Sequence, residues 1–147
     1  MLIIVSKYLI PKGFSGFTFF PFIFLKKKED RLNWVLLNHE RIHICQQLEM
    51  LVFPFFVWYF LEFLIRLVLY RNWKKAYYNI SFEKEAYLHD NNAEYLKDLF
   101  QKSYLEHNNL TDATRFLANE LFQNEGLVII DGDDVDLKKI FAPYVER

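Results

Sequence analysis

The sequence predicts an α+β fold that is mostly helical and has two parts. Two runs rich in Ile, Val, Phe and Thr, residues 2–10 and 17–25, are separated by a proline and two glycines, which is typical of a β-hairpin. Three helical stretches follow. The composition then changes, and residues 111–141 have the helix–strand–helix pattern of a parallel α/β sheet. We therefore expect one domain over residues 1–100 and an α/β fragment over residues 101–147.

Composition excludes several classes of protein. Of 147 residues, 52% are hydrophobic and 19% aromatic, which excludes a disordered chain. A net charge of −1 gives no electrostatic footprint for binding nucleic acid. A single cysteine excludes a disulfide scaffold and a cysteine-built zinc site.

Capping residues and prolines place the first two helices. Asp30 or Asn33 can cap a helix that reaches about Leu51. Pro54 fits the first turn, or a kink, of a second helix that continues to about Tyr70.

A polar, aromatic connector over residues 71–79 precedes a third helix, which begins at Ser81 and is expected to reach about Phe100. In the tail, we expect a helix, an apolar strand and a second helix, over residues 111–123, 127–130 and 135–141.

The second helix raises the question of a membrane. Its uncharged run from Met50 to Leu61 is too short to span a bilayer, and Glu62 and Arg66, which can pair one turn apart, follow it. Its aromatic residues fit either burial in a core or partner, or contact with a membrane surface through residues 50–70. No cleavable signal peptide is predicted. We expect a cytoplasmic protein, with peripheral attachment to the inner membrane as the alternative.

The strongest chemical signal is His39-Glu40-Arg41-Ile42-His43, an H-E-x-x-H motif within the first helix. Histidines four residues apart project from one face, so that both imidazoles can reach one metal ion. Glu40 would lie beside the remaining coordination position and could act as general base toward a metal-bound water.

A catalytic zinc needs a third protein ligand. Glu83 and Glu85, at the start of the third helix, are the candidates, and either can serve. Both glutamates also suit an exposed helix N-terminus, where negative charge is favoured.

The other polar residues of these helices are weaker candidates. Gln46 and Gln47 could order the site helix, although a plain helix face is expected for them. Cys45 is expected to be a buried inert thiol and not a ligand, and His89 a surface or core histidine and not a spare ligand. An oxyanion could be stabilised by Tyr77, Tyr78 or Tyr87.

Three separated motifs resemble a known family: Asn38 to His43 with Gln46-Gln47, the aromatic helix around Trp58 to Glu62, and Asn79 to Tyr87. Over residues 1–97 the chain is similar to small, uncharacterised H-E-x-x-H proteins of Bacteroidota, which look like glutamate zincins. The resemblance implies a zinc metallopeptidase. It gives Glu83 the ligand position, and Tyr87 replaces the family's buttressing aspartate, a role that Asp90 could take.

The tail resembles a different family. Leu110 to Phe116, Glu120 to Phe122, Gly126 to Asp134 and Leu137 to Pro143 are similar to an internal stretch of the bacillithiol-biosynthesis cysteine-adding enzyme (BshC). That resemblance, over about residues 104–147, implies one helix–strand–helix unit of a Rossmann-like domain. We expect a gene fusion or deletion that joined two neighbouring reading frames near residues 97–104, and a strand left without partners in a sheet.

These patterns together predict a zinc-dependent hydrolase of peptides or other amides. His39, His43 and Glu83 (or Glu85) would hold Zn²⁺, and Glu40 would be the general base. Two alternatives stay open: a fragment of the cysteine ligase, and a non-catalytic membrane-surface or interaction protein. The sequence names no particular peptide or protein substrate.

Overall fold

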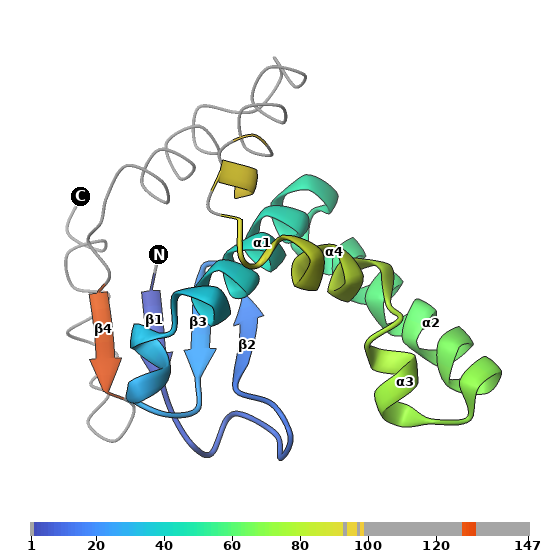
Figure 1. Cartoon of the computed structure of the whole chain (residues 1–147), viewed down its shortest axis with the longest axis horizontal. Helices are drawn as coiled ribbons and strands as arrows, with labels where there is room; N and C mark the ends of the chain where they lie inside the picture. The colour runs from blue at the N-terminus through green and yellow to red at the C-terminus, as the bar shows by residue number, and fades with distance from the viewer. Residues whose placement is uncertain (1, 93, 97, 99–127, 132–147) are drawn as a thin grey trace.

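The computed structural model describes residues 2–92, 94–96, 98 and 128–131 of the chain (Figure 1). The described part is mostly helical with a small mixed sheet. Its strands are β1 (Leu2–Val5), β2 (Gly16–Phe19), β3 (Phe22–Leu25) and β4 (Val128–Asp131). Its helices are a 3₁₀ turn (Glu29–Leu32), α1 (Trp34–Met50), α2 (Val52–Tyr70), α3 (Trp73–Tyr77) and α4 (Ser81–His89).

The sheet has the strand order β2-β3-β1-β4. β2 and β3 pair antiparallel, while β1 runs parallel to β3, with Leu2 opposite Phe22. The predicted hairpin between residues 2–10 and 17–25 is therefore wrong. Pro21 has no N–H and cannot continue a ladder, so the second run breaks there and folds into a hairpin of its own.

One face of the sheet packs against α1, which crosses it in Figure 1. Alternate residues of β1 and β3 are buried, as expected for strands with one covered face. They form one cluster with two α1 residues, Leu37 and Ile44. This cluster fixes α1, the helix of the H-E-x-x-H motif, on the sheet.

The starts of α1 and α2 agree with the sequence. Asn33 caps α1 by accepting a hydrogen bond from the Leu36 N–H, whereas Asp30, the alternative cap, lies in the 3₁₀ turn. Pro54 lies in the first turn of α2, where its missing N–H costs no helical hydrogen bond. The predicted pair Glu62–Arg66 is present, at 2.9 Å.

The connector after α2 contains the short helix α3, which the sequence did not predict. Asn72 caps it by accepting from the Lys75 N–H. α3 packs against α2, and the two lie together on the side of the molecule away from β4 (Figure 1).

α4 begins at Ser81 as predicted but ends at His89, well before Phe100. The Asn38 side-chain amide donates to the carbonyls of His89, Asp90 and Asn92, at 3.3, 2.9 and 3.3 Å. These contacts satisfy carbonyls that a continuing helix would use, and the chain turns there before residues 94–96 become helical again.

A second core joins α1 to α4. Ile42 and Cys45 of α1 form a buried cluster with Ala86 and Leu96. Cys45 is thus the buried thiol that the sequence predicts, and burial raises its pKa to about 12. This core holds α4 beside the H-E-x-x-H motif.

β4 corresponds to the apolar strand predicted at residues 127–130. It pairs in parallel with β1, Leu2 lying opposite Val128. The expectation that this strand has no sheet partner is therefore wrong. The helices predicted at 111–123 and 135–141 lie outside the described residues, and the domain boundary at residue 100 stays a prediction.

Candidate metal centre

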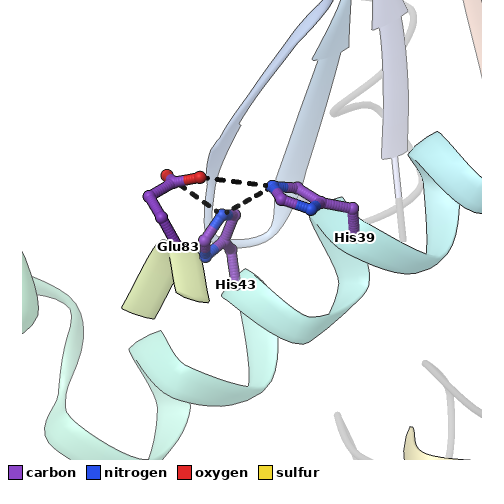
Figure 2. A group of neighbouring side chains, drawn as sticks. All are labelled: His39, His43 and Glu83. Atoms are coloured by element: carbon purple, nitrogen blue, oxygen red, sulfur yellow. Dashed lines mark hydrogen bonds and ion pairs between the residues drawn. The ribbon is translucent and has the colours of Figure 1, made fainter. Parts of the chain in front are cut away.

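His39 and His43 lie one helical turn apart on α1, and both side chains are buried. Their Nε2 atoms are 3.2 Å apart and face the same point (Figure 2). The spacing of four residues produces the shared face that the sequence predicts.

Glu83 completes a triangle with these histidines from the facing helix α4 (Figure 2). Its Oε2 lies 3.5 Å from His39 Nε2, and its Oε1 lies 3.4 Å from His43 Nε2. Two ligands of one tetrahedral zinc, each at about 2.0–2.1 Å, are about 3.3–3.4 Å apart. The three buried side chains could therefore hold a metal ion.

Glu85, the alternative third ligand, is engaged elsewhere. Its carboxylate accepts hydrogen bonds from Gln46 Nε2 at 3.1 Å and from the Tyr95 hydroxyl at 2.5 Å. The structure brings Glu83, and not Glu85, to the two histidines.

Two further observations fit a cation at the triangle. The buried Glu83 Oε2 has no hydrogen-bond partner among the described residues. The side-chain carbonyl oxygen of Gln46 accepts a hydrogen bond from His43 Nδ1 at 2.7 Å. The lone pair of His43 Nε2 is then free and is directed at the triangle. An imidazole lone pair and a buried carboxylate oxygen that accepts no hydrogen bond are donors that suit zinc.

His39 has a weaker support than His43. Asp90 Oδ2 lies 3.9 Å from His39 Nδ1, beyond hydrogen-bonding distance, and Nδ1 has no hydrogen-bond partner in the described part of the chain. Tyr87 instead packs its ring against the imidazole, with centroids 4.5 Å apart. An aromatic contact therefore supports the His39 ring on this side.

Glu40 is buried beside the triangle and is held by β2. Its carboxylate accepts a short hydrogen bond from the Thr18 hydroxyl. A Cβ on Gly16 would lie 2.9 Å from the Glu40 carboxyl carbon, so only glycine leaves room for this side chain. Burial raises the pKa of Glu40, which the histidines and Thr18 oppose.

The protonation of the triangle is coupled. Burial by itself would lower the pKa of His43, but the Glu83 and Glu40 carboxylates and the hydrogen bond to Gln46 together outweigh burial and raise the pKa to about 9. Burial likewise works to raise the pKa of Glu83, yet its contacts with His39 and His43 hold it far below the ordinary range. Without metal, the site is a carboxylate paired with an imidazolium at neutral pH.

An apolar cavity of about 320 Å³ opens onto the triangle. Besides the site residues, its lining is mostly aromatic: Phe14, Phe17, Phe55, Phe56, Tyr59, Phe63, Trp73 and Tyr77. Among the residues that the structure describes, no lysine or arginine lines it. The described lining suits an apolar group next to the site.

Several residues that support the site were not predicted from the sequence. Tyr59 of α2 donates to Glu83 Oε1 at 2.7 Å. Gln47, expected on a plain helix face, is buried, donating to the Thr18 carbonyl and accepting from the Phe20 N–H. Gln46 is likewise buried, bonded to His43 and Glu85. The two adjacent glutamines that closely follow the H-E-x-x-H motif were the feature of the sequence from which their supporting role could have been predicted.

The remaining candidates divide between the site and its surroundings. Tyr77 lines the cavity, whereas Tyr78 is exposed. His89 stacks on Tyr95, with ring centroids 3.7 Å apart, and is not part of the triangle.

Comparison with known proteins gives matches to one family. The family model for bacillithiol biosynthesis BshC, N-terminal Rossmann-like domain, matches residues 71–147. Two Flavobacterium proteins named "Putative cysteine ligase BshC", from F. psychrophilum and F. johnsoniae, are each 66% identical to this chain over 56 residues. That stretch is 38% of this chain but only 10% and 11% of theirs. A relative of the same name from Christiangramia forsetii is 59% identical over 54 residues, 37% of this chain and 10% of that protein.

The chain thus spans about one tenth of the length of the curated relatives it matches. No solved structure matches it. The family match begins well before residue 104, where the resemblance in the tail was expected to start, and it includes α3, α4 and Glu83. This match covers just over half of the chain, so the chain belongs to the BshC family through residues 71–147.

Proposed function

We propose that this protein is a zinc-dependent hydrolase of amide bonds, with the metal held by His39, His43 and Glu83. The observation that carries the proposal is the meeting of His39 Nε2, His43 Nε2 and the Glu83 carboxylate. The two nitrogens are 3.2 Å apart, Glu83 Oε1 is 3.4 Å from His43 Nε2, and Glu83 Oε2 is 3.5 Å from His39 Nε2. Some catalytic zinc sites use two histidine nitrogens and one glutamate carboxylate as protein ligands and keep a further coordination position open. His39, His43 and Glu83 offer the same set of donors, with a cavity beside them. A bound zinc would act as a Lewis acid and lower the pKa of a water toward about 7.

Glu40 is the proposed general base. It takes a proton from the attacking water and passes it to the leaving amine. Burial raises its pKa, which suits proton uptake nearer neutral pH than an ordinary glutamate allows. Thr18 and Gly16 hold its carboxylate beside the cavity.

The cavity supports a preference among substrates. Its aromatic walls favour an amide that carries a large apolar group next to the bond to be cut. Since no described residue of the lining is a lysine or an arginine, we expect no preference for a free carboxylate terminus.

The Glu40→Gln variant tests this mechanism. The amide keeps the size of the side chain but cannot accept a proton, so we expect turnover of a peptide with aromatic residues to fall by about 10²–10⁴-fold. Zinc content should stay at the wild-type value, because Glu40 is not a ligand. Full activity in Glu40→Gln would contradict the mechanism.

A second candidate function is a part in cysteine ligation. The comparisons support it more directly than they support the hydrolase, because the matching family model and the relatives are all BshC. Since the match covers a small part of those proteins, we infer at most a contribution to binding cysteine or its acceptor.

Calorimetry of the full chain with cysteine separates the two candidates. Heat of binding that persists in His43→Ala would favour the ligase segment, since a free thiol could otherwise bind through the metal. Absence of binding, together with amide hydrolysis that requires Glu40, would favour the hydrolase.

A further inference from the structure

The outward face of α2 has an unusual composition. Ten residues of α2 are exposed, and every one of them is apolar. The most exposed are Phe53, Trp58, Phe60, Ile65, Val68 and Leu69, with 58 to 78% of their surface accessible. We call these ten residues the α2 outer face. Soluble monomers rarely present an apolar surface of this extent without a partner.

The polar residues of α2 lie on its other side. Tyr59 reaches Glu83, and Glu62 pairs with Arg66 and also accepts from the Ser81 N–H and hydroxyl. The helix is therefore inverted relative to a surface helix of a soluble protein, which shows its polar residues to solvent.

The length of α2 and its flank indicate a lipid bilayer as the occupant. It has 19 residues, with a mean hydropathy of 1.9 over 18 of them, and by length and composition alone it could cross a membrane. Exposed Arg71, Lys74 and Lys75 follow directly, with Lys75 Nζ 4.9 Å from the Tyr70 ring centroid. A cationic cluster at the end of an apolar face complements anionic lipid headgroups.

The Glu62–Arg66 pair, on the side of α2 opposite the outer face, favours a helix that lies on the bilayer over one that spans it. The Glu62–Arg66 pair lies within the second half of α2, where a spanning helix would place charges in hydrocarbon at a cost. A helix lying in the plane keeps this pair above the acyl chains and immerses only the outer face.

We propose that the α2 outer face inserts in the plane of one leaflet of an anionic bilayer, with Arg71, Lys74 and Lys75 against the headgroups. The proposal is independent of the hydrolase function. It places the cavity, which α2 lines with its inner face, next to the membrane surface.

Co-sedimentation of the full chain with vesicles tests this. We expect binding to phosphatidylglycerol–phosphatidylcholine vesicles and at least tenfold weaker binding in Ile65→Glu. Leu32→Glu is the matched control, since Leu32 is 90% exposed, lies outside α2 and receives the same charge. It should bind like the wild type. Lys74→Gln combined with Lys75→Gln should weaken binding selectively in low salt.

Quenching of tryptophan fluorescence by brominated lipids measures whether the α2 outer face reaches the acyl chains. Trp58, 58% exposed on the outer face, should be quenched, and the quenching should be lost in Trp58→Phe. Circular dichroism shows whether Ile65→Glu remains folded, and if it does not, the Trp58 quenching decides. No vesicle binding by the wild type, equal binding by a folded Ile65→Glu, or a dimer without lipid that Ile65→Glu disrupts would each overturn the proposal.

Discussion

Single hydrogen bonds orient the acid and base groups of the site. The Gln46 side chain fixes His43, the Tyr59 hydroxyl fixes Glu83, and the Thr18 hydroxyl fixes Glu40. Each partner comes from a different part of the chain or from another turn of α1. The chemistry of the triangle therefore depends on residues that do not themselves belong to it.

Thr18→Val should shift the pH profile of the hydrolase. The variant keeps the shape of the side chain but removes a hydrogen bond that lowers the pKa of Glu40. The pKa should rise, and the acidic limb of kcat/KM should move to higher pH, with several-fold loss at neutral pH. Thr18→Ser retains the hydroxyl and should restore the profile; an unchanged profile in Thr18→Val would remove this role.

The stability of the metal-free protein should fall as pH rises from 6.5 to about 9. His43 has its pKa raised to about 9 in the folded protein, against about 6.5 when unfolded. Its stabilising contribution is thus complete below pH 6.5 and is lost as the pH passes about 9. The raised pKa of Glu40 acts in the same direction.

Thermal unfolding in the presence of a chelator measures this dependence. We expect the midpoint to decline over that window in the wild type and in His89→Gln, and to be flatter in His43→Gln. A midpoint that rises with pH would contradict the ion pair.

The spacing of His39, Glu40 and His43 was sufficient to predict their shared site, because helical periodicity fixes neighbours one turn apart. Thr18 and Tyr59 could not be predicted in the same way. They are 22 and 24 residues from their partners, and only the packing of the sheet and α2 around α1 brings them together.

At the scale of elements, α4 starts against a side chain of α2. The Glu62 carboxylate accepts from the Ser81 N–H at 3.1 Å and from its hydroxyl at 2.5 Å. A carboxylate at a helix N-terminus satisfies a free donor and interacts favourably with the helix dipole. Glu83, two residues on, is positioned by the same start.

Glu62→Ala should lower the free energy of unfolding by about 1–2 kcal/mol, the usual cost of a lost helix cap. Arg66→Ala removes the ion pair and leaves the cap, so its cost should be about 0.5 kcal/mol or less. Chemical denaturation of both variants checks this difference. Equal costs would show that Glu62 acts only through Arg66.

The starts of α1 and α2 were predictable, whereas strand partners were not. Asn33 and Pro54 act within one turn of their own positions, so their effect is visible in the sequence. Ser81 begins α4 as predicted, but its hydroxyl donates to Glu62 of α2 and does not cap its own helix. The pairing of β1 with β3 and β4 depends instead on contacts between distant segments. The end of α4 also depends on a distant residue, Asn38.

At the scale of the whole molecule, the candidate site joins residues that precede the family match to a residue within it. His39 and His43 precede the segment that matches the BshC family, whereas Glu83 lies within it. β4, also within it, pairs with β1 at the start of the chain. The sequence predicted His39, His43 and Glu83 as one metal site, but it did not predict that the family match would include Glu83 or that β4 would pair with β1.

Metal content per chain is the most direct test of this account. Inductively coupled plasma mass spectrometry should find close to one zinc per wild-type chain and almost none in His43→Ala or Glu83→Gln. His89→Ala, a histidine of α4 outside the triangle, should retain the metal. Absence of zinc from the wild type after supplementation, or zinc retained in His43→Ala and Glu83→Gln, would contradict the central claim.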